Sequence, residues 1–301
     1  MNKAKDADKV MNESKLHPEC IKCLIDKHLY KHSDATEKDR VAYMQAVLTV
    51  LASAEPFLSA PEIVAKIEAV GREFFGSDGD FGEIKHHFNT LMQKHEREII
   101  ERISCSENPL ETALKYSVLG NYIDFGALDS VDEETLSEIL SDTSRIKLET
   151  GEYKNLINDL EKSKYLVFLT DNCGEIVLDK LFLQRIKECC PSIEITVIVR
   201  GSQVLNDATI EDARSIGLTE QFSVIGNGSD VAGTALSEIS DDARSAIDSA
   251  DVIIAKGQGN FETLCGCGKN VYYLFLCKCE MFAKRFGVEK FTGMLLNDKR
   301  M

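Results

Sequence analysis

The chain has 301 residues, of which 44% are hydrophobic and 28% charged, a composition typical of a globular protein with a sizeable core. Its 35 basic and 50 acidic residues give a net charge of −15, which argues against nucleic acid and anionic membranes as general partners. Because no stretch has the roughly 20 apolar residues of a membrane span and the charged residues 1–15 resemble no signal peptide, we expect a loose tail and a cytoplasmic protein.

Residues 16–161 are expected to be mostly helical, because their apolar residues recur with the spacing of amphipathic helices. Pro61 is typical of a first helical position. In chain order, the expected helices are 40–54, one opened by Pro61, 81–99, 109–125 and 132–140.

From Lys164 onward the pattern changes to short, continuously apolar runs, which are typical of buried strands in a parallel sheet. The expected strands are 165–170, 193–199, 222–225, 251–255 and 271–276. Helical stretches separate most of them, so we predict a doubly wound, largely parallel sheet. The chain is thereby expected to divide into a tail 1–15, a helical region 16–161 and an α/β domain 162–301.

The first apolar run leads directly into Asp171, Asn172 and Glu175. Ligands of open α/β sheets bind at the carboxyl ends of the strands. Two adjacent oxygen ligands at that edge suit a hard divalent cation such as Mg²⁺ or Mn²⁺. The alternative for an isolated Asp-Asn pair is a helix cap, since both residues are favoured at that position.

The later runs also end in polar or glycine-rich turns, which makes a shared site at one rim the better interpretation. Asp207 opens a helix after the second run, a lysine-glycine turn at 256–260 follows the fourth, and Lys278 follows the fifth. Carboxylates there could hold a cation, while lysines and helix-start N–H groups could hold phosphate.

Three common phosphate or hydrolase motifs are missing from the sequence. The turn at 256–260 lacks the third glycine of a dinucleotide fingerprint, because Glu262 stands in its place. The chain also has no P-loop and no G-x-S-x-G elbow.

The ten cysteines, in a chain without a secretory signal, are expected to be reduced. Cys20 and Cys23 form a C-x-x-C pair, which is half of a tetrahedral zinc site. A structural zinc, a redox pair and packed free thiols all stay open, with packed thiols favoured.

An ordered set of motifs spans most of the chain. It comprises the C-x-x-C at 20–23, residues 81–85 with Asn89, residues 108–126, 171–175 with Asp179, 206–207, 233–234, 256–262 and 278–279. In this set the sequence resembles the damage-control phosphatase family, most of all its prokaryotic branch with an N-terminal C-x-x-C. The sequence departs from the family at one point, since Gly79 and Asp80 stand where the family's D-P-[YF] stretch has Asp and Pro.

The resemblance implies a helical N-terminal region beside a Rossmann-like domain that binds one divalent cation (Mg, Mn, Co or Ni). It implies hydrolysis of phosphate monoesters of small metabolites, such as sugar phosphates or damaged phospho-metabolites. The implied cation ligands are Asp171, Asn172 and Asp207. For the mechanism we expect attack by a metal-activated water, with Asp171, Asp207 and Glu175 as the catalytic carboxylates and the last two as candidate general bases. An aspartyl-phosphate route is the alternative, although Cys173 stands where its second acid would be.

The resemblance also implies which residues contact the substrate. The implied phosphate ligands are Lys256, Gly257, Gly259, Asn260 and Lys278. The further substrate-facing candidates are Lys85, Asn89, Asn121 and Asp124, for which surface or capping positions are the alternative.

Two other classes of function stay open at this point. One is a cysteine-based metal or redox protein, and the other is a phospho-metabolite binder without catalysis. The motifs set neither the natural substrate nor the oligomeric state.

Overall fold

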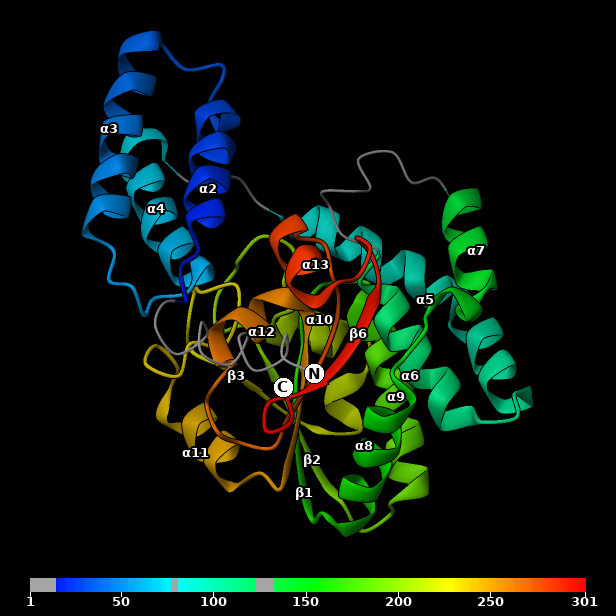
Figure 1. Ribbon diagram of the computed structural model, residues 1–301. Helices are drawn as coiled ribbons and strands as arrows, with labels where there is room; N and C mark the ends of the chain where they lie inside the picture. Colours follow the sequence, from blue (N-terminus) through cyan, green and yellow to red (C-terminus); the bar gives the residue numbers. More distant parts are fainter. Residues whose placement is uncertain (1–14, 77–80, 123–132) are drawn as a thin grey trace.

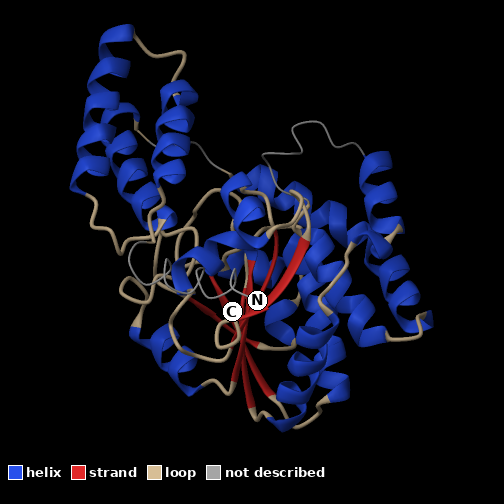
Figure 2. Cartoon of the chain, in the orientation of Figure 1, coloured by secondary structure: helices blue, strands red, loops and turns tan. Residues whose placement is uncertain are grey.

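The computed structural model describes residues 15–76, 81–122 and 133–301. Figure 2 shows a central sheet surrounded by helices, with a separate group of helices to one side. None of the helices in these three ranges is long and apolar enough to cross a membrane.

Among the described residues, the sheet has six strands in the order β3-β2-β1-β4-β5-β6. They are β1 (Tyr165–Leu169), β2 (Glu194–Val199), β3 (Ser223–Gly226), β4 (Val252–Lys256), β5 (Val271–Leu276) and β6 (Gly293–Asn297). β1 to β5 pair in parallel and β6 pairs antiparallel with β5. This confirms the predicted doubly wound, Rossmann-like sheet, and adds β6, which the sequence pattern did not predict.

The strand order places β1 next to β4, although the two are far apart in the sequence. The chain leaves β1 towards β2 and β3 on one side and later adds β4 and β5 on the other. Such a reversal opens a crevice at the carboxyl ends of the two central strands. The residues that follow β1 and β4 therefore face each other across this crevice.

The two faces of the sheet are buried by different helices. The helices beside the sheet are α5 (Gly82–Cys105), α6 (Pro109–Gly120), α7 (Glu133–Ser141), α8 (Thr150–Lys162), α9 (Glu175–Cys189), α10 (Ile210–Ser215), α11 (Asp241–Ser249), α12 (Gly257–Leu264) and α13 (Glu280–Phe286). Leu166 and Phe168 of β1 share a core with α5 to α10, whereas Val167 and Leu169 share a core with α11 to α13. Both sides of β1 are thus covered, which explains its unbroken apolar sequence.

The N-terminal helices α2 (Pro18–Lys31), α3 (Glu37–Ser53) and α4 (Ala60–Phe75) form a bundle with a small core of their own. This bundle projects from the α/β body in Figure 1, and α4 contacts α12. Helices α5 to α8, by contrast, share one core with the sheet. The change from helices to strands near residue 162 is therefore not a boundary between hydrophobic cores, and the predicted division into domains stays a prediction.

Candidate active site

A cleft of about 350 Å³ lies at the carboxyl ends of the central strands, between the α/β body and the helical bundle. Residues from α2 and α4 line one wall, including Lys27 and Pro61, and the turns after the strands line the rest. The predicted site residues that line it are Asn121, Asp171, Asn172, Asp207, Gly259 and Lys278.

The turn after β1 is fixed by backbone hydrogen bonds to the segment after β2. Asn172 and Asp207 form an isolated antiparallel bridge, and the Ala208 N–H donates to the Asp171 carbonyl at 2.8 Å. Gly174 has a φ of +79°, and its N–H donates to the Asn89 side-chain oxygen at 2.7 Å. These contacts bring together the three residues predicted as metal ligands.

The Asp171 carboxylate lies among both donors and other acids. The side-chain amides of Asn121 and Asn172 donate to its Oδ2 at 3.0 and 2.8 Å. Burial, followed by the nearby charges of Asp207 and Glu175, raises the pKa of Asp171 well above its ordinary value. Buried negative charge of this kind is relieved by a bound cation. Two carboxylates and an amide oxygen therefore fit a hard divalent ion.

Arg200, which follows β2, is a component of the site to which the sequence analysis gave no role. Its side chain is only 2% exposed, and its Nε donates to the Asp207 carboxylate. Its Nη2 lies 3.8 Å from Asp171 Oδ1 and has no hydrogen-bond partner within the described ranges. Arg200 thus pairs with both of the acidic residues that are predicted as metal ligands. The sequence signal that could have revealed this role is an arginine placed directly after an apolar run.

Lys256, at the end of β4, does not line the cleft. Its side chain is fully buried, and its ammonium group donates to the Ser117 carbonyl at 2.9 Å, to Glu175 Oε1 at 2.5 Å and to Asp179 Oδ1 at 2.6 Å. Burial raises the pKa of Asp179 to about 7, although Lys256 opposes the shift. The geometry therefore suits an internal ion cluster better than the direct phosphate contact that the resemblance implied.

The two glycines of the 256–260 turn allow close approach of backbone to neighbouring groups. Gly257 has a φ of +78°, and a Cβ there would lie 2.0 Å from Asp171 Oδ2. A Cβ at Gly259 would lie 2.2 Å from the Ala232 carbonyl oxygen. The first turn of α12 can therefore lie directly against the predicted metal ligands.

Asn260 does not line the cleft, and its side chain instead bridges the backbone at the ends of β1 and β4. It is fully buried, and its Nδ2 donates to the carbonyls of Thr170 at 3.1 Å and Lys256 at 2.7 Å. Its Oδ1 accepts from the Thr234 hydroxyl at 2.7 Å.

The helical candidates divide into cleft residues and supporting residues. Asn121, at the end of α6, reaches the cleft. Lys85 is buried in an ion pair with Asp212 at 2.7 Å, and Asn89 also donates to Asp212, so both lie behind the turn after β1. Asp124 lies outside the described residues.

The comparisons with known proteins decide the family. A family model described as the damage-control phosphatase ARMT1-like domain matches residues 16–293. The chain belongs to the damage-control phosphatase family.

Two relatives and one solved structure match this member of the damage-control phosphatase family along most of its length. A damage-control phosphatase of Archaeoglobus fulgidus is 31% identical over 284 residues, covering 91% of this chain and 96% of the relative. A damage-control phosphatase of Pyrococcus horikoshii is 31% identical over 230 residues, covering 75% of this chain and 77% of the relative. The crystal structure of a DUF89 family protein from Pyrococcus horikoshii matches with a TM-score of 0.77 and 28% identity, covering 94% of this chain and 99% of that one.

These matches confirm the family and support phosphatase activity for this chain. They do not distinguish the branch with an N-terminal C-x-x-C, although Cys20 and Cys23 are present. The resemblance seen in the sequence was thus correct at the level of the family.

The C-x-x-C pair lies on α2 at the edge of the bundle. Cys23 is exposed, while Cys20 is partly buried against the core formed with α11 to α13. Burial, together with the nearby Glu262 and Cys279, raises the pKa of Cys20 to about 11. All ten cysteines are free thiols, and the described ranges contain no group of three or more His, Cys, Asp or Glu side chains arranged to hold a metal. A structural zinc or redox role for this pair stays a prediction.

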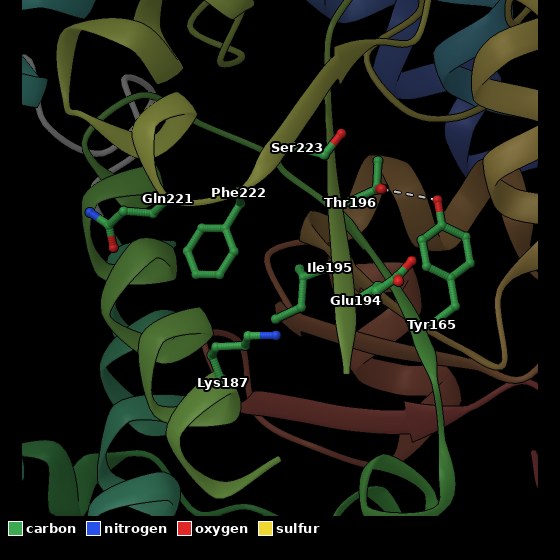
Figure 3. A pocket seen from close by; sticks show the side chains of 8 residues that line it. All are labelled: Tyr165, Lys187, Glu194, Ile195, Thr196, Gln221, Phe222 and Ser223. Carbon is green, nitrogen blue, oxygen red and sulfur yellow. Dashed lines mark hydrogen bonds between the residues drawn. The ribbon is translucent and has the colours of Figure 1, made fainter. Parts of the chain in front are cut away.

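Two further hollows differ in their relation to the cleft. One of about 230 Å³ adjoins it, sharing Val64, Leu205 and Ala232 with its wall. Another, of about 500 Å³, lies at the opposite ends of the strands, where Figure 3 shows Tyr165 donating to Thr196. This second hollow contains none of the predicted site residues, so its larger volume does not make it the active site.

Glu262 lines the cleft, and its titration is expected to affect stability. Burial raises its pKa to about 7, and Gln258 donates to it at 2.8 Å. Since the folded state then binds the proton more tightly than the unfolded chain, folding stability falls as pH rises from about 4.5 to about 7. Glu262→Gln should raise the unfolding free energy of the metal-free protein by about 1–3 kcal/mol at pH 8 and leave it unchanged near pH 4.

Urea unfolding at both pH values checks this expectation, with the exposed Glu280→Gln as the control. An equal change at the two pH values would contradict the assigned burial of the Glu262 charge.

Proposed function

We propose that this protein is a divalent-metal-dependent phosphatase that hydrolyses phosphate monoesters of small metabolites. The observation that carries the proposal is the convergence of Asp171, Asn172 and Asp207 in one cleft, with the pKa of Asp171 raised by burial and by neighbouring acids. A bound cation would neutralise phosphate charge and lower the pKa of a water molecule.

The protein's own residues would bind and orient the phosphate group. Lys278 lines the cleft and supplies a positive charge. The start of α12, with Gly259 in the cleft wall, supplies backbone N–H groups at the positive end of a helix dipole. Because the protein carries a net charge of −15, these local donors are needed to hold an anion.

Asp207 is the better of the two predicted general bases. Its carboxylate lines the cleft and is oriented by Arg200. Glu175 is fully buried and does not line the cleft. We therefore assign proton acceptance to Asp207, with Arg200 as the residue that orients it.

The organic part of the substrate would extend into the adjoining hollow of about 230 Å³. Glu68, Arg72 and Gln203 lie in its wall and can hydrogen-bond hydroxyl groups. This favours a polar substrate such as a sugar phosphate or a damaged phospho-metabolite.

The ten free thiols support the proposed cytoplasmic location, where thiols stay reduced.

Phosphate release from a panel of sugar phosphates and an aryl phosphate tests the proposal. The assay would be run with Mg²⁺, Mn²⁺, Co²⁺ or Ni²⁺ and with chelator, on the wild type and on Asp171→Ala. We expect release that depends on the cation and is lost in the variant. No release with any cation would favour a non-catalytic phospho-metabolite binder, and metal analysis for zinc or iron would then test the cysteine-based alternative.

A further inference from the structure

Two side-chain amides in the cleft wall are oriented by the same pair of carboxylates. Asn172 Nδ2 donates to Asp171 Oδ2 at 2.8 Å and to Glu175 Oε2 at 3.1 Å. Asn121 Nδ2 donates to the same two oxygens at 3.0 and 2.9 Å. Glu175 is ion-paired with Lys256, and an ionised carboxylate only accepts hydrogen bonds, so each amide must present its NH₂ group to it. The opposite orientation would place an amide oxygen against two carboxylate oxygens.

The orientation of Asn172 leaves its side-chain oxygen directed away from Glu175. Within the described ranges, this oxygen accepts no hydrogen bond from the protein. Asn172 lines the cleft, so an oxygen ligand is available there. The Asn121 oxygen, in contrast, accepts from the Leu276 N–H at 3.4 Å.

Both oxygens of Glu175 are already engaged below the cleft. Oε1 accepts from Lys256 at 2.5 Å, and Oε2 accepts from the two amides. The side chain is 0% exposed. A carboxylate in this position has no oxygen directed at a water molecule in the cleft.

The position of Glu175 is set by Lys256 and by the packing of α6. Lys256 is itself held by the Ser117 carbonyl and by Asp179. α6 packs closely on the Glu175 backbone, because a Cβ at Gly120 would lie 3.1 Å from both Cα and Cγ of Glu175. The carboxylate that directs the two amides is therefore a fixed reference point.

We propose that Glu175 is a positioning residue: anchored by Lys256, it directs the amides of Asn121 and Asn172 so that the Asn172 oxygen is presented to a divalent cation. This inference rests on the proposed function, and it assigns to Lys256 and Glu175 a role that requires no contact with substrate.

Mn²⁺ affinity measured by isothermal titration calorimetry tests the inference without an activity assay. In Glu175→Gln, the new NH₂ group must face either Lys256 or the two amides, and all of these are donors. We expect Mn²⁺ to bind about 10- to 100-fold more weakly, the usual effect of losing an outer-shell partner.

Glu96→Gln is the matched control. Glu96 pairs at 2.8 Å with Lys180, a buried lysine of α9, the helix that begins at Glu175, and contacts neither amide. Its replacement should leave Mn²⁺ affinity unchanged. Equal weakening of Mn²⁺ binding in both variants would overturn the inference. Losing the acidic partner of any buried lysine would then be enough to weaken binding, whether or not that partner contacts the amides.

The pH–rate profile separates positioning from proton transfer. With saturating Mn²⁺, the rate of Glu175→Gln should fall at low pH as the wild-type rate does, because this acidic limb of the profile reports protonation of the general base. Loss of that limb with unchanged Mn²⁺ affinity would overturn the inference and make Glu175 the general base. A wild type that binds no Mn²⁺ would contradict the proposed function itself, and this inference with it.

A second variant covers the case in which Glu175→Gln does not fold. Gly120→Ala keeps every charge but places a methyl group against Glu175. Circular dichroism would show whether Gly120→Ala folds, and we expect the folded variant to bind Mn²⁺ more weakly than the wild type. Unchanged binding in a folded Gly120→Ala variant would count against the inference.

Discussion

Replacement of Asp171 by asparagine is expected to lower kcat for phosphate release by about 10²–10³-fold, the usual scale for removing one preorganised electrostatic contact. The substitution keeps the size of the side chain and an oxygen that can accept from Asn121 and Asn172. It removes the negative charge that we propose to bind a cation. Steady-state kinetics with saturating Mn²⁺ measures the loss, with the exposed Asp26→Asn as the control.

The same substitution is expected to stabilise the protein without metal. Burial and the charges of Asp207 and Glu175 raise the pKa of Asp171 in the folded state. The folded protein therefore loses stability as pH rises from the ordinary carboxyl pKa towards that raised value. Asp171→Asn should unfold at a higher temperature than wild type at neutral pH, with the difference vanishing in acid. A variant that binds cation and keeps near-wild-type activity would contradict the proposed role of Asp171.

Gly257→Ala is expected to disrupt the site through shape alone. The added Cβ would lie 2.0 Å from Asp171 Oδ2, and the position has a φ of +78°. Asp171 or the start of α12 must then move, and a displacement of about 1 Å at a catalytic group can cost about 10²-fold in rate. We expect that loss in kcat together with weaker Mn²⁺ binding.

Gly266→Ala is the matched control for backbone strain. Gly266 has a φ of +82°, but a Cβ there meets nothing within 4 Å. Both variants carry the cost of a left-handed backbone, about 1–3 kcal/mol, so the difference between them reports the collision with Asp171. Equal activity in the two variants would show that Gly257 is not needed for close approach.

The sequence predicted the convergence of the metal-ligand candidates because two simple features determine it. An unbroken apolar run indicates a strand buried on both faces, and the carboxyl ends of parallel strands meet at one edge. Asp171 and Asp207 each follow such a run, so the doubly wound topology alone is enough to bring them close together. Asn172 and Asp207 do pair as backbone neighbours.

The direction of Lys256 could not be predicted from its place at the rim. Val252 and Ile254 pack with α6 and α9, and Ile253 and Ala255 pack on the other face. Alternation along β4 therefore turns Lys256 towards α6 and α9, where Glu175 and Asp179 lie. The alternation is present in the sequence, but which helices cover each face depends on long-range packing.

Arg200 and β6 escaped prediction for different reasons. Arg200 follows β2 at the same rim, but its partners Asp171 and Asp207 come together only after folding. β6 has the short sequence Gly-Met-Leu-Leu-Asn and pairs antiparallel with β5 as an edge strand. Five residues between polar segments give little periodicity on which to base a prediction.

The most direct test of the metal site is anomalous diffraction at the manganese edge from crystals grown with Mn²⁺ and inorganic phosphate. We expect one peak ligated by Asp171, Asn172 and Asp207, with phosphate bound beside it near Lys278 and the start of α12. A peak at Cys20 and Cys23 instead, or an ordered cleft without Mn²⁺, would contradict the account.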